Sequence, residues 1–485
     1  MIYRILEIWN DFVLIYFIGL NGVYLLLIVL SYFSINRYLK ASNFLDDKKL
    51  FRSSSLLKPI SIIAPAYNES QTVITNIRSL MKLNYPNYEI ILVNDGSSDD
   101  TLVKVEEYFE MKKSAKAAIG HIPTEKINAI YRSSKYPNLT LVDKENGGKA
   151  DALNVGINLS RNPLVTAIDT DSLLEKDVLL KMVRPFIERP ETIAVGGVVR
   201  IINGCKVKAE NLTEIGLPNK LVPLFQIIEY FRAFFFGRVG WETMNMLLII
   251  SGAFGIFRKK ELLEVNGYRS DTIGEDMDLI VRLHKHMRDK KEKYHIGFVA
   301  EPVCWTEAPD SLAVLKRQRN RWHRGLLDAL RYNKSMIFNP KYGRIGLVAM
   351  PFALIVEGLG PIVEFLGFFT VAYAYWVGSL NVTFALAFLS AAILLGVVMS
   401  TSALIIEELT FRRYPSMKNI FILFMVAIIE NFGYRQMNSW WRFVAIFDFI
   451  KGKQGWGSMP RTGFDSVVEG EADDNSASEN KKIAP

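Results

Sequence analysis

The stretch LVTAIDTD, residues 164–171, decides how the surrounding chain is interpreted. Its apolar run predicts a buried strand, and the run ends in two carboxylates, Asp169 and Asp171, separated by one residue. Residues two apart on a strand point to the same side, so the two carboxylates lie close together. Paired carboxylates are poor core groups and good ligands for a hard divalent cation. The stretch therefore predicts a cation site at the end of a buried strand.

Residues 57–345 repeat this plan of a strand followed by a polar turn and a helix. The repeats are ISIIAPAYNES at 60–70, EIILVNDGSSDDTL at 89–102 and LTLVDKENGGKADALNVGINLS at 139–160. Alternating strands and helices predict an α/β fold with a mostly parallel sheet, whose ligands gather at the carboxyl ends of the strands. Asp95, Asp143 and Asp169 all lie at predicted strand ends.

Other segments of this region are assigned by their composition. Residues 191–205 and 246–257 predict further strands. Residues 104–135 carry mixed charge with weak periodicity, and we expect a surface helix and a loop there. Residues 221–238 are aromatic and amphipathic, so both a core helix and a helix in the membrane interface fit them.

Apolar runs on both sides of the α/β region predict membrane helices. Hydrophobic residues make up 50% of the chain and the mean hydropathy is +0.14, which favours a membrane protein with a soluble part. Residues 12–33 are uncharged and long enough to cross a bilayer, and the basic flank after them places the following domain in the cytoplasm. Residues 346–377 and 383–406 predict two more crossings, whereas 419–450 fit either a hairpin or one crossing with an interfacial helix.

Cysteine content and net charge narrow the class of protein further. The two cysteines, Cys205 and Cys304, have no CxxC spacing, which argues against a disulfide framework and a zinc site and indicates a reducing cytosol. The net charge of +8 suits acidic products, nucleotide substrates and anionic lipid alike. The charge alone therefore does not choose a partner.

Two residues near the strand ends each have a structural and a functional interpretation. Asp95 in VNDGSS either caps a turn or accepts hydrogen bonds from the base of a nucleoside diphosphate, whose phosphates Mg²⁺ or Mn²⁺ would bridge to the paired aspartates. Lys149 in NGGKADALN either contacts a phosphate or is an ordinary surface lysine. The segment is not a P-loop, because Ala150 follows the lysine where that motif requires Ser or Thr.

Two predicted helices carry further candidates. The segment IGEDMDLIVRL begins with Glu275 and Asp276, which either complement the helix dipole or supply a general base to a hydroxyl. In RQRNRWHRGLLDAL, Gln318, Arg321 and Trp322 share one helix face. An indole suits stacking on a sugar ring and a guanidinium suits phosphate oxygens. A basic amphipathic helix on the membrane surface is the alternative.

Six motifs resemble, in order and approximate spacing, those of the processive, membrane-embedded family-2 glycosyltransferases: PAYNES, VNDGSSDDT, ENGGKADALN, IDTD, GED and QRNRW. That family includes bacterial cellulose, hyaluronan, chitin-oligosaccharide and poly-β-1,6-N-acetylglucosamine synthases. The match covers about residues 57–330. The resemblance implies a nucleotide-sugar-binding glycosyltransferase A-type domain with a mostly parallel sheet, joined to an α-helical transmembrane domain.

The resemblance also implies a role for each candidate residue. Asp95 would bind uracil and ribose, Asp169 the diphosphate, Asp169 and Asp171 the Mg²⁺ or Mn²⁺ ion, and Asp276 would be the catalytic base; Lys149 would lie near the nucleotide, and Gln318, Arg321 and Trp322 would bind the donor diphosphate and the acceptor end. Trp456 in GWGSMPR resembles a C-terminal loop that closes over the donor sugar, and a bare interfacial loop is the alternative.

The expected protein is an inverting, processive enzyme that transfers sugar from a UDP-sugar to a growing β-linked polysaccharide and passes it across the bacterial inner membrane. UDP-N-acetylglucosamine is the favoured donor, because the chain is closer in size and membrane layout to the N-acetylglucosamine synthases. Cellulose synthases usually carry a cyclic-di-GMP-binding β-barrel where this chain has a tail, which argues against cellulose. A UDP-glucose-dependent glucan synthase and a single-addition, lipid-linked glycosyltransferase are the alternatives. Membrane lipid is an expected partner, the need for an accessory subunit stays open, and no nucleic acid is expected.

The resemblance and the composition together divide the chain into six parts. They are an N-terminal transmembrane helix at 1–40, a cytosolic glycosyltransferase domain at 57–310, an interfacial QxxRW helix region at 311–345, transmembrane and interfacial helices at 346–450, a basic C-terminal loop at 451–464 and a disordered acidic tail at 465–485.

Overall fold

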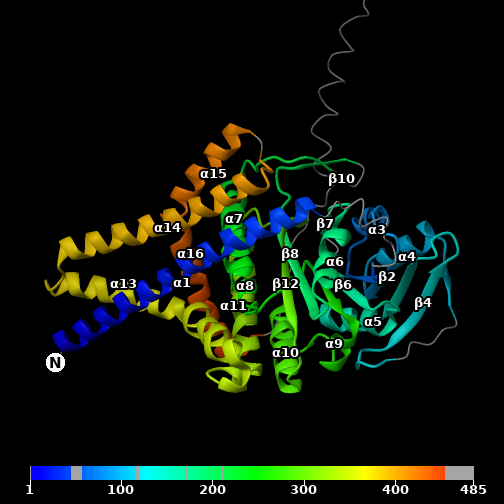
Figure 1. The fold of residues 1–485 in the computed structure, drawn as a ribbon, viewed down its shortest axis with the longest axis horizontal. Helices are drawn as coiled ribbons and strands as arrows, with labels where there is room; N and C mark the ends of the chain where they lie inside the picture. Colours follow the sequence, from blue (N-terminus) through cyan, green and yellow to red (C-terminus); the bar gives the residue numbers. More distant parts are fainter. Residues whose placement is uncertain are drawn as a thin grey trace, which may run out of the picture.

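The computed structural model describes residues 2–44, 57–114, 120–169, 172–208, 211–414 and 416–453. An α/β domain with one large sheet forms one side of the molecule, and long apolar helices project from its other side (Figure 1). The predicted site residues Asp171 and Trp456, and the predicted tail at 465–485, lie outside the described residues.

The central sheet has ten strands in the order β3-β4-β5-β2-β1-β6-β11-β8-β12-β7. Most of the strands run in one direction, because β5, β2, β1 and β6 are parallel neighbours, as are β8 and β12, while β11 is antiparallel to the strands on both of its sides. The strands are β1 (Ile60–Ala66), β2 (Tyr88–Asp95), β3 (Met111–Lys113), β4 (Ile127–Ser133), β5 (Leu139–Lys144), β6 (Leu164–Ile168), β7 (Ser172–Leu174), β8 (Thr192–Ile201), β11 (Phe254–Arg258) and β12 (His295–Thr306). The short strands β9 (Lys206–Lys208) and β10 (Asn211–Glu214) form a separate pair.

The register of the parallel strands brings the predicted carboxylates together at the carboxyl ends of the strands. Ala66 lies opposite Asn94, Asn94 lies opposite Asp143, and Ile63 lies opposite Ala167. In this register the carboxyl ends of β1, β2, β5 and β6 lie side by side. Asp95 ends β2, and Asp169 directly follows β6.

Helices flank this sheet and bury its near-continuous apolar strands. α5 packs on β1 and β2, α6 on β8 and β12, and α9 on β11. β6 and β8 are buried along their whole length, as expected for strands that are covered on both faces. The helices are α3 (Val73–Met81), α4 (Thr101–Tyr108), α5 (Lys149–Leu159), α6 (Val178–Glu188), α9 (Lys259–Glu264) and α10 (Glu275–Lys290).

The prediction of a surface helix and a loop for residues 104–135 is only partly right. α4 ends at Tyr108, and the segment then supplies β3 and β4, an antiparallel pair at the edge of the sheet. An edge strand has fewer neighbours and exposes more of its side chains, so its hydrophobic pattern is weak. Weak periodicity in this segment therefore reflects an edge position and not the absence of strands.

A second group of helices joins the α/β domain to the apolar helices. α7 (Leu221–Phe231) continues into the π-helix η2 (Arg232–Gly240) and the short α8 (Trp241–Thr243). α7 contacts β8 on one side and α14 (Val382–Thr410) and α15 (Met417–Ile429) on the other, so the aromatic segment 221–238 is packed between the sheet and the apolar helices. α11 (Leu312–Tyr332), which carries QRNRW, contacts both α10 and α16 (Tyr434–Ile450).

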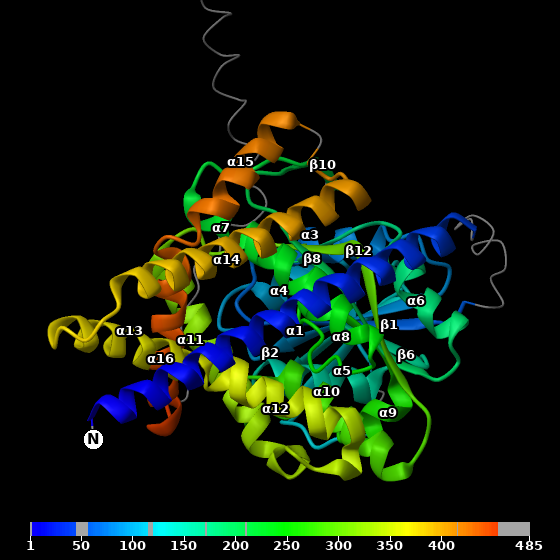
Figure 2. The same cartoon turned by 60° about the vertical axis from the view of Figure 1, so that its left-hand side comes forward.

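The apolar helices include two that are each long and apolar enough to cross a membrane, or up to four if two bent helix pairs count as one span each. The two are found within α1 (Ile2–Phe44) and α14 (Val382–Thr410). One bent pair is Ile345–Gly358 with α13 (Gly360–Trp376), and the other is α15 (Met417–Ile429) with α16 (Tyr434–Ile450). Figure 2 shows α1, α13 and α14 extending to the same side of the molecule.

The bends occur where the sequence interrupts the apolar pattern. The first pair is bent by 42° between Gly358 and Gly360, where glycine and proline are concentrated in the sequence GLGP at 358–361. The second pair is bent by 56° between Ile429 and Tyr434. Residues 419–450 therefore form two helices at an angle. This arrangement fits both predictions for the segment, a hairpin and one crossing with an interfacial helix.

Candidate active site

One cavity of about 2540 Å³ begins at the carboxyl ends of the parallel strands and continues between α7, α11 and the apolar helices. The predicted site residues that the structure describes all line it, although they come from five separate stretches of the chain: Asp95, Lys149, Asp169, Asp276, Gln318, Arg321 and Trp322. A concave site with convergent polar groups is the expected form of a ligand site.

Asp95 holds the glycine turn that directly precedes the first residue of α5. Its carboxylate accepts hydrogen bonds from the backbone N–H of Gly147 at 3.0 Å and of Gly148 at 2.8 Å, and from Lys144 Nζ at 2.5 Å. Gly148 has φ +85°, which a residue with a side chain rarely adopts. Asp95 therefore anchors the glycine turn before α5, which is distant in the sequence from its own VNDGSS segment, and its contact with a nucleoside stays a prediction.

Lys144 is a buried partner of Asp95 that the sequence analysis did not single out. Its side chain is fully buried and pairs with Asp95 and, at 2.8 Å, with Asp151 in the first turn of α5. A buried ammonium needs such partners, because an isolated charge in the interior is strongly unfavourable. The signal in the sequence was a lysine at the end of the apolar strand LTLVDK.

Lys149, the first residue of α5, lies among the acidic side chains at the strand ends. Its ammonium forms an ion pair with Asp169 and lies 3.9 Å from Glu275 Oε1. It also donates to the carbonyl oxygen of Gly252 at 3.5 Å. A Cβ on Gly252 would lie only 3.2 Å from Lys149 Nζ, so the glycine lets the backbone approach this cluster.

Two carboxyl groups of the cluster have raised pKa values. Burial raises the pKa of Asp276 above its ordinary value, although the Met277 N–H and the Lys149 ammonium oppose the rise. Burial also raises the pKa of Glu275 to about 7, with a further contribution from the charge of Asp276. Burial would lower the pKa of Lys149, but the charges of Asp169 and Glu275 outweigh it and keep the ammonium protonated. A carboxylate whose pKa approaches neutrality is suited to act as a general base.

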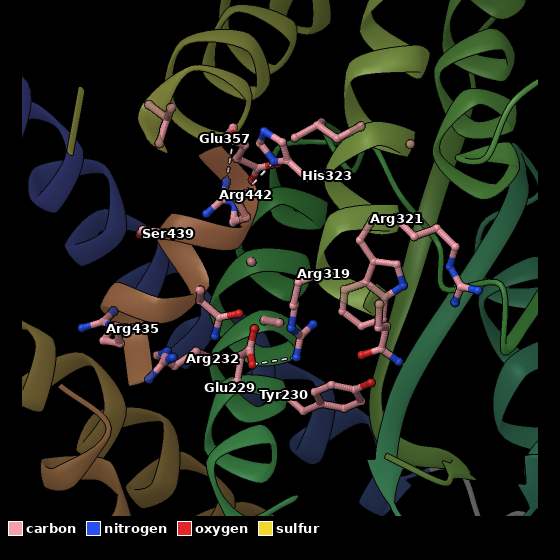
Figure 3. A pocket seen from close by; sticks show the side chains of 18 of the residues that line it. Glu229, Tyr230, Arg232, Arg319, Arg321, His323, Glu357, Arg435, Ser439 and Arg442 are labelled. Atoms are coloured by element: carbon pink, nitrogen blue, oxygen red, sulfur yellow. Dashed lines mark hydrogen bonds and ion pairs between the residues drawn. The ribbon is translucent and has the colours of Figure 1, made fainter. Parts of the chain in front are cut away.

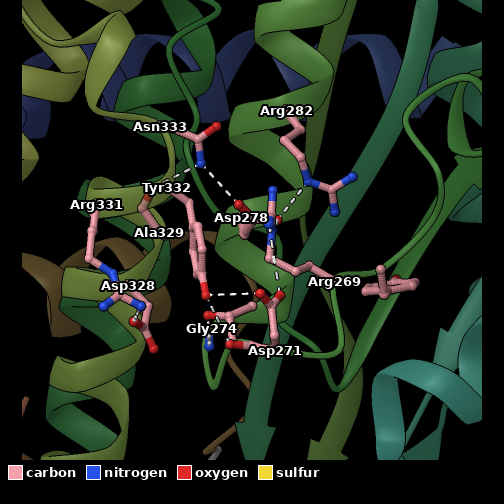
Figure 4. A network of polar contacts seen from close by, with 12 residues as sticks. Arg269, Asp271, Gly274, Asp278, Arg282, Asp328, Ala329, Arg331, Tyr332 and Asn333 are labelled. Carbon is pink, nitrogen blue, oxygen red and sulfur yellow. Dashed lines mark hydrogen bonds and ion pairs between the residues drawn. The ribbon is translucent and has the colours of Figure 1, made fainter. Parts of the chain in front are cut away.

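The start of α10, which carries Glu275 and Asp276, is held by a polar network shown in Figure 4. Asp278 accepts hydrogen bonds from Arg282 Nε at 2.6 Å and from Asn333 Nδ2 at 2.9 Å, and the Tyr332 hydroxyl donates to Asp271 at 3.0 Å. Asn333 and Tyr332 lie at the end of α11. The network therefore connects the helix of the proposed base to the helix of the QRNRW motif.

The donor set at Asp169 fits a hard divalent cation. Its carboxylate is partly exposed to the cavity and already pairs with a cationic group, the Lys149 ammonium. Carboxylate oxygen is a preferred ligand of Mg²⁺ and Mn²⁺. No group of three or more His, Cys, Asp or Glu side chains suited to a metal occurs among the described residues, which do not include Asp171.

The QRNRW helix presents its predicted face to the cavity. Gln318, Arg321 and Trp322 all line it, and the Trp322 residue is 45% exposed. The Gln318 side chain is buried, and its Oε1 atom has no hydrogen-bond partner among the described residues. An unsatisfied buried acceptor beside a cavity is a group that a bound ligand can satisfy.

Polar side chains also line the cavity where it passes between the apolar helices, as Figure 3 shows. Arg232 pairs with Glu430, and Arg435 Nη1 donates to Asn431 Oδ1 at 2.8 Å. Arg442 from α16 donates to the carbonyl oxygen of Glu357. Charged groups in apolar helices are retained where they face an interior or an aqueous cavity. Arg435 and Arg442, two charged residues in the apolar segment 419–450, thus line the cavity.

The sheet, its strand-end site and the comparison with solved structures define a glycosyltransferase A-type fold. A mannosyltransferase from Pyrobaculum calidifontis, whose structure contains GDP-Man and Mn²⁺, superposes with a TM-score of 0.50 at 17% identity. The superposition covers 86% of this chain and 99% of that enzyme.

The chain carries a family-2 glycosyltransferase domain. Residues 61–262 match the model of glycosyl transferase family 2, and residues 164–399 match that of glycosyl transferase family group 2. A poly-β-1,6-N-acetyl-D-glucosamine synthase of Staphylococcus epidermidis is 30% identical over 290 residues, 58% of this chain and 60% of the relative. The synthase of Staphylococcus aureus is 29% identical over 270 residues, 56% of this chain and 55% of the relative. The chain thus matches a little over half of the length of these curated relatives.

Proposed function

We propose that the protein is an inverting, processive glycosyltransferase that transfers sugar from a UDP-sugar, with UDP-N-acetylglucosamine favoured, to a growing β-linked polysaccharide. The observation that carries the proposal is the single cavity that contains Asp276, Asp169 and Trp322 and continues between the apolar helices. The homology to poly-β-1,6-N-acetylglucosamine synthases supports the choice of donor.

In the proposed reaction, the Asp276 carboxylate removes the proton of the acceptor hydroxyl. The resulting oxygen attacks the anomeric carbon of the donor, and the bond from that carbon to the diphosphate breaks, so UDP leaves with the bonding electrons. A single displacement inverts the anomeric centre. The fixed cationic group of Arg321 stabilises the departing diphosphate.

Asp169 and Asp171 would hold a Mg²⁺ or Mn²⁺ ion, which supplies positive charge to the leaving diphosphate. Lys149 would turn from Asp169 toward a phosphate, because the same ammonium can pair with either anion. Asp95 and Gln318 would contribute to donor binding from the two ends of the site. Trp456 would close over the donor sugar.

Trp322 would stack on the terminal sugar of the acceptor, and the product would leave along the polar cavity between the apolar helices. We propose a bacterial inner-membrane protein with the domain at 57–310 in the cytoplasm, the QxxRW region at 311–345 at the interface and the helices at 346–450 in or on the bilayer. The apolar helices support a membrane location.

The test is UDP release from each UDP-sugar in turn by the purified full chain, with Mg²⁺ or Mn²⁺, together with the length of the product. Wild type is expected to release UDP with one donor and make long chains; single additions would contradict processivity. Asp276→Asn is expected to bind UDP and make no polymer. Asp289→Asn, at the far end of α10 in an exposed pair with Lys341, is the matched control and should be fully active.

A further inference from the structure

Trp322 is packed against the neighbouring Arg319 from the same motif. The Arg319 guanidinium carbon lies 4.4 Å from the centre of the indole ring, within the distance of a cation–π contact. The exposed fractions of the two residues differ, because Trp322 is 45% exposed and Arg319 only 5%. Arg319 therefore covers part of the indole from the protein side and leaves the rest open to the cavity.

Arg319 is fixed in turn by Glu229 from α7. Its Nη2 atom donates to Glu229 Oε2 at 2.8 Å, as Figure 3 shows. The same carboxylate oxygen accepts a hydrogen bond from the Tyr434 hydroxyl at 2.9 Å. The Tyr434 ring stacks on Phe225, one turn before Glu229 on α7, with ring centres 4.6 Å apart. Glu229 thus connects the QRNRW helix to α7 and to α16.

We propose that Arg319 and Glu229 are positioning residues that hold the Trp322 indole in the orientation needed to bind the acceptor sugar. The inference rests on the proposed function and adds two residues to its acceptor site. A guanidinium stacked on one side of an indole restricts the rotation of the ring. The acceptor then binds a platform that is already ordered, and less conformational entropy is lost on binding.

The charge on Glu229 is essential to this arrangement. Arg319 is nearly fully buried, and a buried guanidinium without a counter-charge tends to move toward water. Replacement of Glu229 by Gln keeps the size of the side chain and removes the charge. Arg319 should then leave the indole, while Asp276, Asp169 and Lys149 keep their contacts, which are with groups other than Glu229 and Arg319.

The test compares Glu229→Gln and Arg319→Met with wild type in two assays on the purified full chain. The first is binding of a β-linked hexosamine oligosaccharide and, separately, of UDP with Mn²⁺, by calorimetry. The second is steady-state kinetics, which measures KM for acceptor, KM for donor and kcat separately. Arg184 and Glu188 form a similar Arg–Glu pair on α6 away from the cavity, at 2.6 Å, so Glu188→Gln is the control. Arg319→Lys tests rescue by a second cation.

Both test variants are expected to bind the oligosaccharide about 10-fold more weakly, to raise KM for acceptor by a similar factor and to shorten the product, with UDP binding and KM for donor unchanged. Arg319→Lys should recover part of the loss. Equal weakening of UDP and oligosaccharide binding would overturn the positioning role and indicate general loss of structure, and unchanged oligosaccharide binding would also overturn it. Failure of wild type to bind oligosaccharide and release UDP would overturn the proposed function itself.

Discussion

Gly274 and Gly325 lie backbone to backbone, where the loop before α10 meets α11. A Cβ on Gly325 would lie 2.9 Å from the Cα of Gly274, and a Cβ on Gly274 would overlap the carbonyl oxygen of Gly325. Asp276 follows two residues after the first glycine, and Trp322 precedes the second by three. The distance between the proposed base and the proposed acceptor platform is therefore set by an approach that only glycine permits.

Gly325→Ala is expected to push α10 and α11 apart. Overpacking of this kind costs about 1–3 kcal/mol of stability. A displacement of the base by about 1 Å can reduce the rate by about 100-fold. Thermal unfolding and UDP release measure the two effects. Gly22→Ala, in α1 with open space where the added Cβ would lie, is the control and should leave both unchanged. A fully active Gly325→Ala enzyme would show that the contact does not position the site.

The rate of sugar transfer is expected to fall as the pH decreases. Asp276 acts as a base only when it is deprotonated, and burial raises its pKa, so the base is lost at a higher pH than for a free carboxyl group. Burial also raises the pKa of the neighbouring Glu275, to about 7. Glu275→Gln removes a neighbouring negative charge, which should lower the pKa of Asp276 and move the acidic limb of kcat/KM to lower pH. Lys149→Met removes a positive charge and should move the limb to higher pH. If the acidic limb has the same pH midpoint in both variants and in wild type, protonation of Asp276 is not the cause of the limb.

Removal of the Asp169 carboxylate is expected to weaken binding of the divalent ion. In Asp169→Asn, Mn²⁺ measured by electron paramagnetic resonance in the presence of UDP should stay in solution at concentrations that saturate wild type, because a neutral amide is a poorer ligand than a carboxylate. Asp289→Asn should bind Mn²⁺ as wild type does. Equal Mn²⁺ binding by the Asp169→Asn protein would refute the proposed ligand.

A buried ion pair between Arg200 in β8 and Glu407 in α14 fixes the α/β domain to an apolar helix. Both residues are nearly fully buried, and the Arg200 guanidinium also lies 4.5 Å from the centre of the Phe231 ring. Glu407→Gln leaves the arginine charge unpaired and is expected to destabilise the protein by about 3–5 kcal/mol. Glu214→Gln breaks an exposed pair with Lys206 and should cost about 1 kcal/mol or less. Similar unfolding temperatures for the two variants would contradict this assignment.

Much of the fold was predictable because its signals are local. The strand at 164–168 is a continuous apolar run, and α11 shows its cavity face through residues spaced three and four apart. The prediction failed at β3 and β4, where a segment at the sheet edge has no strong pattern of its own. Among the described strands, β3 pairs only with β4, and β4 is held to the sheet by β5, so the assignment of these strands depends on their pairing partners and not on a pattern of their own.

For the site, the sequence by itself determined which groups stand at the strand ends and helix starts: Asp95, Lys149, Asp169 and Asp276. Only the tertiary structure decided what those groups contact. In the structure Asp95 accepts a hydrogen bond from the glycine turn before α5, and Lys149 forms an ion pair with Asp169. Arg319 forms an ion pair with Glu229 on another helix. The physical reason is that a residue's type and spacing fix its local backbone and available chemistry, whereas burial, counter-charges and pKa depend on side chains brought close from distant parts of the chain.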